Sequence, residues 1–415
     1  GTYEAVIDSL CSVDVDGEKI RPKVVASTAT VRRADRQVKR LFNRPLAVFP
    51  PQGLDIEDSF FGEETKDEPG RLYVGVFGPG KSIKTTLVRT YSALLGRGKY
   101  EHEMQPGDET DAYMSLVGYF NSLRELGGTV RLVEDDVPKR LRHLKRRGFS
   151  PNRILHEKPE LTSRKVSSDI SKILGRLNQT HAEPESGAYP VDVLLASNMI
   201  SVGVDIDRLG LMVVSGQPKT TAEYIQATSR VGRKFPGLVV CIYNWSRPRD
   251  ISHYETFHHY HSTFYRHVEA TSVTPFSERA RDRSFPAVLA AHSRMSQPKY
   301  SNESDANEFD RQDLVVEEFE RFLIDRARKV ARHGEEVGQE SAQQLGRLLF
   351  EWDRYANAET PLVYSSQGDK EKTKAVLLGR MENENSKGIW EAAGSLREVE
   401  DELDIVIKQY QDEGE

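Results

Sequence analysis

The sequence has very little cysteine and no long apolar run. Its two cysteines, Cys11 and Cys241, are too few and too far apart to predict a disulfide framework or a zinc site. No apolar stretch approaches the roughly 18–20 residues that span a bilayer, and no secretory signal is recognisable at the start. We therefore expect a protein of the reducing cytoplasm that has no membrane as a partner.

Hydrophobic residues are also sparse, at 37% of 415 residues, which is lean for a chain long enough for two or three domains. The first six residues read as the interior of a domain, so we expect a piece of a longer protein. Residues 301–415 carry 28 acidic and 15 basic side chains, whereas residues 1–300 carry 36 acidic and 43 basic ones. A mildly basic body suits a phosphate-rich partner, although solvated charge gives the same pattern.

Short apolar runs separated by helical stretches dominate the middle of the chain. Strand-like runs occur at 72–77, 116–120, 130–133, 191–195, 211–214 and 238–243. Buried runs joined by helices predict an α/β fold, with a doubly wound parallel sheet covered on both faces. Polar loops rich in Pro and Gly are expected at about 99–111 and 178–190.

The remaining chain divides by composition. The N-terminal part combines a helical start, a turn at Asp16-Gly17, a strand at 23–26 and a helix at about 32–42. We predict five segments: an N-terminal segment 1–62, a charged linker 63–70, an α/β lobe 71–248, a His-, aromatic- and Arg-rich extension 249–300, and an acidic, mostly helical region 301–415.

One helical stretch carries residues suited to phosphate chemistry. Thr220 followed by Glu223 is a capping box, which predicts a helix start. Gln226, Arg230 and Arg233 then follow at i, i+4 and i+7, a spacing that would place them on one helical face. Guanidinium groups match phosphate oxygens and stabilise charge on a transferring phosphoryl group. A solvated helix face remains the alternative on spacing alone.

This stretch resembles a motif of superfamily 2 helicases. Residues 226–233 read close to QxxGRxGR, with Ser229 in place of a glycine. Residues 196–206 are similar to the family's ATxxxxxGxDI motif. Residues 116–122 are similar to the strand motif with which the nucleic-acid contacts of the second lobe begin. Residues 27–30 resemble the S/T-A-T motif that closes the first lobe. The resemblance implies a RecA-like second helicase lobe, preceded by part of the first lobe and followed by a mostly helical extension.

The resemblance also implies roles for individual residues. Arg230 and Arg233 would contact the γ-phosphate of ATP, with Arg233 as the arginine finger, and Gln226 would position nucleotide or water. Gly203 would let the backbone approach the nucleotide closely, and Asp205 would contact the ribose or the arginines. DNA, single-stranded or with a single-stranded overhang, would be held through its phosphates by Asn121, Ser122, Ser197 and Asn198. ATP binding would be coupled to the strand by Ser27, Thr28 and Thr30.

A closer similarity links the chain to the large helicase-like subunits of the bacterial DISARM anti-phage systems. It covers most of residues 190–285 and is carried by the stretches 199–205, 216–219, 223–233, 243–250, 252–255 and 272–276. The similarity implies a DNA helicase or translocase in antiviral defence. It also implies a companion DISARM subunit, DrmB, as a partner.

The family's Walker A and DExH motifs should precede the S/T-A-T motif, but only 26 residues precede Ser27 and none forms a DExH box. ATP and Mg²⁺ would thus be held mainly by the first lobe. We expect the full-length protein to hydrolyse ATP and this chain alone to be inactive.

A P-loop-like sequence in this chain argues against this expectation. Residues 75–82 satisfy G-x4-G-K-[ST] after a strand, so Lys81 could belong to a P-loop. The motif lies in the wrong order for the family, and Pro79 removes one N–H from the cradle. A helix-entry turn is the favoured interpretation. A self-contained P-loop enzyme using Lys81 and a non-catalytic helicase-like scaffold remain the alternatives.

Two further clusters stay ambiguous. The histidines between His253 and His267 alternate with aromatic residues at helical spacing, which favours core packing, and we predict no metal site. The basic run 139–147 could follow a phosphate backbone or form a solvated helix face.

Overall fold

The computed structural model describes residues 1–28, 31–49, 51, 58–59, 62–63, 67, 69–149, 151–162, 165, 167–181, 189–201, 205–365, 374–380 and 388–392. The chain splits into two compact units. Unit 1 comprises Gly1–Ser27, Arg33–Phe49 and Thr271–Glu415, and unit 2 comprises Thr28–Arg32 and Pro50–Ala270. The five segments predicted from composition stay a prediction. Unit 1 combines N-terminal and C-terminal stretches that we predicted as separate segments.

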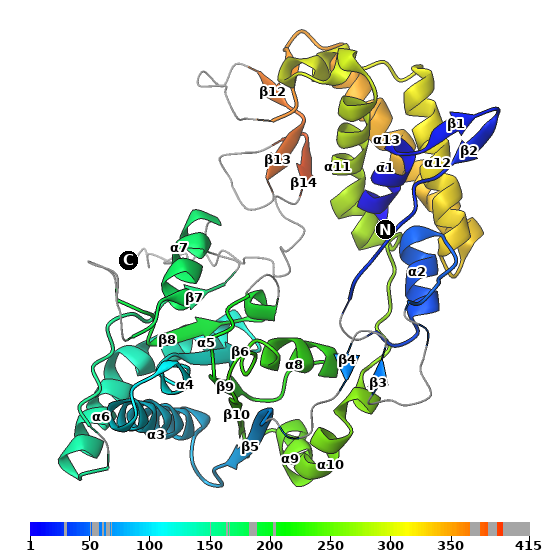
Figure 1. The fold of residues 1–415 in the computed structure, drawn as a ribbon. Coiled ribbons are helices and arrows are strands. Elements are labelled where there is room, and N and C mark those ends of the chain that lie inside the picture. Colours follow the sequence, from blue (N-terminus) through cyan, green and yellow to red (C-terminus); the bar gives the residue numbers. More distant parts are fainter. Residues whose placement is uncertain are drawn as a thin grey trace, which may run out of the picture. The chain divides into compact units, whose positions relative to one another are not determined.

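Unit 2 is built on a six-stranded parallel sheet with the order β5-β10-β9-β6-β8-β7 (Figure 1). The strands are β5 (Arg71–Phe77), β6 (Leu116–Phe120), β7 (Glu160–Leu161), β8 (Val193–Ala196), β9 (Leu211–Ser215) and β10 (Gly237–Tyr243). Five of them match the predicted runs to within a few residues. The doubly wound α/β class is confirmed, because helices connect the parallel strands and cover both faces.

Successive side chains along the strands point alternately into the two apolar cores of unit 2. From β6, Leu116 and Phe120 face one core and Val117 and Tyr119 face the other. The first core lies against α3 (Ile83–Met104), α5 (Leu123–Arg131), the π-helix η1 (Leu132–Asp136) and α6 (Val137–Arg146). The second lies against α7 (Ser167–Asn178), α8 (Thr221–Thr228) and α10 (Phe257–Ser262). Unit 2 also contains α4 (Asp108–Asp111), α9 (Pro248–Glu255), η2 (Asn198–Ser201), η3 (Phe264–His267), β3 (Asp58–Ser59) and β4 (Gly62–Glu63).

Three predicted elements are wrong. The run 130–133 is helical, because Val133 and Val137 point into the core at helical spacing, and the apolar run is therefore one buried stripe of a longer helical segment. Residues 23–26 form no strand; Val25 is exposed and without a paired neighbour strand among the described residues. The loop expected from residue 99 begins only after Met104, since α3 continues to that point.

Unit 1 is mostly helical, as predicted for the C-terminal region. Its helices are α1 (Thr2–Leu10), α2 (Ala34–Phe42), α11 (Glu278–Ser296), α12 (Leu314–Val330) and α13 (Gly334–Ala356), with the short turns η4 (Pro298–Tyr300) and η5 (Glu303–Glu308). Its strands are β1 (Val13–Val15), β2 (Glu18–Ile20), β11 (Leu362–Val363), β12 (Ala375–Val376), β13 (Leu378–Arg380) and β14 (Trp390–Ala392). The predicted turn joins β1 to β2, because Asp16 and Gly17 both take positive φ angles, of 54° and 81°.

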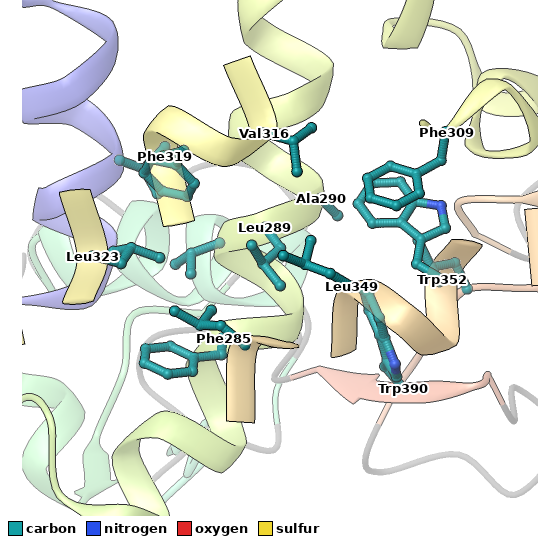
Figure 2. Close-up of a cluster of buried hydrophobic side chains, with 14 of the residues drawn as sticks. Phe285, Leu289, Ala290, Phe309, Val316, Phe319, Leu323, Leu349, Trp352 and Trp390 are labelled. Carbon is teal, nitrogen blue, oxygen red and sulfur yellow. The ribbon is translucent and has the colours of Figure 1, made fainter. Parts of the chain in front are cut away.

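One apolar core holds unit 1 together. Figure 2 shows Leu289 of α11 beside Leu349 of α13, with Phe319 and Leu323 entering from α12. Trp352 stacks on Phe309 with ring centroids 4.0 Å apart. Burying large side chains of this kind contributes roughly 1.5–3 kcal/mol each, so this core is the main source of stability for the unit.

A buried ion cluster anchors the N-terminal helix inside unit 1. Asp8 of α1 has a side chain that is 1% exposed and pairs with Arg21, Arg44 and Arg326. Arg326 lies on α12 and also reaches Glu4 at 2.9 Å. Because these arginines come from three separate stretches, the cluster ties residues 1–44 to the C-terminal helices.

Candidate nucleotide and nucleic-acid sites

Helix α8 begins as predicted but ends earlier. Thr220 accepts a hydrogen bond from the backbone N–H of Glu223 at 3.2 Å, which caps the helix. The Glu223 carboxylate does not complete a capping box, because it accepts the Tyr119 hydroxyl at 2.5 Å. The helix ends at Thr228 with Ser229 as its C-cap. Arg230 therefore lies beyond the helix, and the inference of one helical face is wrong.

The segment after α8 folds back against the amino-terminal edge of the sheet. Gly232 has a φ of 72°, and its N–H donates to Leu209 at 2.8 Å. A Cβ at this position would lie 2.7 Å from the Gly237 backbone, so glycine is required for this close approach. Arg71 donates to the Val231 carbonyl at 2.6 Å. This packing, rather than helix periodicity, positions the residues that follow.

The fold brings Arg233 and Asp205 together. Arg233 donates to an Asp205 carboxylate oxygen and lies 3.6 Å from that of Asp207. Its side chain is 28% exposed, while that of Asp205 is 79% exposed. Gln226 lies in α8, and its carbonyl accepts the Ser229 hydroxyl at 2.9 Å. The predicted nucleotide residue Gly203 lies outside the described residues.

The predicted nucleic-acid residues lie at the opposite, carboxyl-terminal edge. Asn121 and Ser122 follow β6, whereas Ser197 and Asn198 follow β8. Because β6 and β8 are parallel neighbours, all four residues share one edge. Asn198 is exposed, and Ser197 is mostly buried with its hydroxyl 3.4 Å from the Asn198 side-chain oxygen.

Asn121 and Ser122 form hydrogen bonds that stabilise the backbone at this edge. The Asn121 amide donates to the carbonyls of Ser215, Gly216 and Gln217 at 3.1–3.4 Å, which holds the turn after β9. The Ser122 hydroxyl caps α5 by accepting from the Glu125 N–H at 3.3 Å. A hydroxyl that accepts one bond still has a proton to donate, so Ser122 can contact a phosphate oxygen.

Arg247, which the motif comparison missed, belongs to this edge. It lies on the loop after β10 and donates to Glu125 at 2.6 Å, and this hydrogen bond raises the pKa of Arg247 above its usual range. A Cβ placed on Gly216 would lie 3.4 Å from the Asn121 amide nitrogen and 3.7 Å from an Arg247 nitrogen. These distances place Arg247 beside the predicted residues. A hollow of about 320 Å³ at this edge is lined by Arg247, Lys84 and Arg124 together with apolar side chains of α3.

The P-loop-like turn has the hydrogen bonds of a helix entry. The Lys81 N–H donates to the Gly78 carbonyl at 3.1 Å, and Gly80 takes a φ of 71°. The Ser82 hydroxyl accepts the Thr85 N–H at 3.1 Å and caps α3. A P-loop needs its backbone N–H groups directed at phosphate, and this turn closes on itself instead. The geometry favours the helix-entry interpretation.

The remaining predicted residues are placed as follows. Ser27 and Thr28 are exposed in a segment without regular secondary structure, and Thr30 lies outside the described residues. The histidines of α9 and α10 pack among aromatic rings: His261 bonds the Tyr224 hydroxyl at 2.8 Å and lies 4.0 Å from the Phe257 ring. Among the described residues, no group of three His, Cys, Asp or Glu side chains could hold a metal ion.

Comparison with known proteins matches this description. Residues 152–235 fit the family model of the helicase conserved C-terminal domain, and this range includes both the Ser197–Asp205 and Gln226–Arg233 stretches. Residues 152–235 of unit 2 therefore resemble the C-terminal domain of helicases, as the motifs predicted, and the six-stranded parallel sheet confirms the doubly wound fold class. The chain is also similar to the DISARM protein DrmA of Bacillus paralicheniformis (strain ATCC 9945a / NCIMB 11709 / CD-2). The identity is 43% over 98% of this chain and 36% of that protein.

Solved structures similar to the chain include two helicases. The DUF1998 helicase MrfA bound to DNA and AMPPNP gives a TM-score of 0.41 at 15% identity, over 67% of this chain and 32% of that one. The Mycobacterium smegmatis helicase Lhr bound to ssDNA and AMP-PNP gives 0.37 at 16% identity, over 65% and 28%. The chain thus spans about a third of the length of the relatives that it matches. No helix in the described part of the chain is long and apolar enough to cross a membrane.

Proposed function

We propose that the whole protein is an ATP-dependent DNA helicase or translocase of bacterial anti-phage defence, in which unit 2 is the second lobe. The observation that carries the proposal is the ion pair between Asp205 and Arg233, formed by two residues of the helicase motifs. The similarity to DrmA supports the role in defence. It also supports a companion DISARM subunit, DrmB, as the partner, and the low cysteine content supports the cytoplasm as the place of action.

The residues at the amino-terminal edge suit a triphosphate. Arg233 combines an accessible guanidinium with a carboxylate that fixes its direction, and a guanidinium in a fixed direction stabilises charge that develops on a phosphoryl group. Arg230 lies three residues away, in the same turn. We propose that Arg233 acts as the arginine finger, with Arg230 and Gln226 at the same nucleotide. The first lobe would supply most contacts to ATP and Mg²⁺. Bound ATP supplies the phosphoanhydride bond that water cleaves.

The residues at the carboxyl-terminal edge suit a phosphate backbone. Ser122, Ser197 and Asn198 offer hydroxyl and amide groups, and Arg247 adds a cation. Such groups bind phosphates without reading sequence. We propose that single-stranded DNA, or DNA with a single-stranded overhang, crosses this edge, and that Asn121 shapes the turn beneath it. Because the two groups lie at opposite edges of one sheet, a change of nucleotide state at one edge would move the lobe that holds the strand.

The proposal is tested by ATP hydrolysis of the whole protein, with and without single-stranded DNA. We expect turnover that DNA stimulates, and a fall of about 10³-fold or more for Arg233→Ala. Lys234→Ala is the matched control, because this exposed neighbouring cation lies 3.6 Å from Asp108 rather than at the Asp205 pair. Equal loss in the two variants would contradict a finger role for Arg233.

The alternatives give different outcomes in the same assay. Turnover that survives Arg233→Ala but is abolished by Lys81→Ala would show a self-contained P-loop enzyme. Absence of turnover in the whole protein, together with DNA binding that does not weaken as salt rises, would show a scaffold.

A further inference from the structure

A second basic groove lies between α3 and α6, away from the helicase motif residues. It has a volume of about 510 Å³, and its floor includes Val88 and Leu132. The walls carry the cations Lys84, Arg89, Lys139 and Arg140, together with His143. The basic run of 139–147 is thus not a uniformly solvated face, because part of it lines a hollow opposite cations of another helix.

The charge in this groove is almost entirely of one sign. Asp136 is the one acidic residue in its lining. Among the described residues, no carboxylate forms an ion pair with Lys84, Arg89, Lys139 or Arg140. Like charges held in one hollow repel each other, and a polyanion relieves that repulsion. The groove therefore fits a ligand with several negative charges in a row.

The spacing of the cations suits consecutive phosphates. Lys84 and Arg89 are five residues apart on α3, which corresponds to roughly 7.5 Å along the helix. A single strand is more extended than a strand in a duplex, which carries one charge per roughly 3.4 Å, so about two consecutive phosphates fit along this wall. Lys139 and Arg140 line the facing wall from α6.

The groove also continues from the proposed strand-binding edge. Lys84 lines both this groove and the hollow that contains Arg124 and Arg247. The cations therefore form one path from the carboxyl-terminal edge of the sheet to α6. The π-helix η1 contributes Leu132 and Asp136 to the groove, and π-helical turns often occur at functional positions.

We propose that the groove between α3 and α6 binds the sugar-phosphate backbone of the DNA strand where it continues beyond the carboxyl-terminal edge. The contact is independent of sequence, because every side chain involved pairs with phosphate rather than with bases. It lengthens the DNA footprint of the second lobe and adds to the salt dependence of binding. The inference rests on the proposed binding of DNA at the edge.

The test compares two lengths of single-stranded DNA on the 415-residue chain by fluorescence anisotropy. One oligonucleotide of about 6 nucleotides covers the edge, and one of about 16 nucleotides reaches the groove; both lengths lie within the usual range of site sizes. Lys139→Ala/Arg140→Ala removes two cations of the groove. Arg142→Ala/Lys145→Ala is the matched control, because it removes one arginine and one lysine from α6 that are exposed and do not line the groove.

For the groove variant we expect unchanged binding of the short oligonucleotide and at least about tenfold weaker binding of the long one at low salt. The slope of log affinity against log salt should fall by about 1.4, at roughly 0.7 per phosphate contact. The control variant should keep both affinities within about twofold. Circular dichroism checks that both variants remain folded.

The two proposals fail in different ways. If the short oligonucleotide does not bind the unaltered chain, the proposal of DNA binding at the edge fails. If the long oligonucleotide still binds in that case and loses affinity in the groove variant, the groove remains supported as a binding site by itself. If the groove and control variants weaken binding equally, the effect is general charge and the groove proposal fails. An acidic peptide that displaces the long oligonucleotide at equal charge would assign the groove to a protein partner and overturn the inference.

Discussion

Arg247 on the loop after β10 donates to Glu125 in the first turn of α5 at 2.6 Å, across 122 positions of sequence. The pair joins the carboxyl ends of strands that lie two apart in the sheet. Glu125 thereby holds the cation at the edge where DNA is proposed to cross, and it also offsets part of its charge. This relationship gives the first prediction.

Glu125→Gln should strengthen binding of single-stranded DNA by about threefold, because it removes a negative charge beside Arg247. Arg247→Ala should weaken binding at low salt. Anisotropy titrations on the 415-residue chain measure both effects. Glu134→Gln is the control, because this acid on η1 is exposed and lies in neither hollow. Weaker binding by Glu125→Gln would show instead that the carboxylate positions Arg247.

Asp205→Asn should lower the DNA-stimulated kcat of the whole protein by about 10- to 100-fold, because the amide holds the Arg233 guanidinium less firmly than a carboxylate does. The KM for ATP should change less, since the effect concerns the direction of the finger. Steady-state kinetics separate the two parameters. Asp207→Asn provides the comparison, because its carboxylate lies farther from Arg233, at 3.6 Å. An equal loss of kcat in the two variants would argue against a specific role for Asp205.

Asp8→Asn should destabilise unit 1 by about 3–5 kcal/mol, because it leaves the buried Arg326 and two partly buried arginines without their shared carboxylate. Urea unfolding in a Trp245→Phe background measures this, since Trp352 and Trp390 of the unit 1 core then report alone. Asp16→Asn is the control. Asp16 is exposed in the β1–β2 turn, where asparagine tolerates the positive φ.

The Asp8 carboxylate should also make the stability of unit 1 depend on pH in the acidic range. Burial acts to raise the pKa of Asp8, but hydrogen bonding and charge from Arg21, with Arg326 and Arg44, outweigh it and hold the pKa below its ordinary value of 3.8. Since the folded pKa is depressed, the stabilisation is present above pH 3.8 and is lost as the pH falls through the folded value. Unit 1 of Asp8→Asn should therefore lose less stability on acidification than the unaltered unit.

His292 should make unit 1 less stable below neutral pH. Burial, followed by the charge of Lys19, lowers the pKa of His292 to about 4, and its ring stacks on Phe319 at 3.7 Å. Because the neutral ring is favoured in the fold, stability should decline as pH falls from 6.5 to about 4 and then level off, by at most about 3 kcal/mol. His292→Gln should flatten this decline in urea titrations between pH 7 and 4. An unchanged slope would contradict the assignment.

Much of unit 2 was predictable from residue patterns. β6 and β9 are continuous apolar runs because parallel strands are buried on both faces, and their limits follow directly from those runs. Thr220 marks the start of α8 through a local hydrogen bond to the backbone of Glu223. By contrast, the run 130–133 was ambiguous, because a short apolar stretch fits either a strand or one stripe of a buried helix.

The sequence by itself determined the parallel α/β lobe, the helical character of the C-terminal region and the identity of the helicase motifs, since these depend on local apolar patterns and short spacings. Only the tertiary structure decided where α8 ends, because Gly232 packs on Gly237 and Leu209 from other parts of the chain. It likewise decided that Arg247 lies beside Asn121. Contacts between residues more than a hundred positions apart leave no periodic signal, and it is the order of strands in the sheet that creates them.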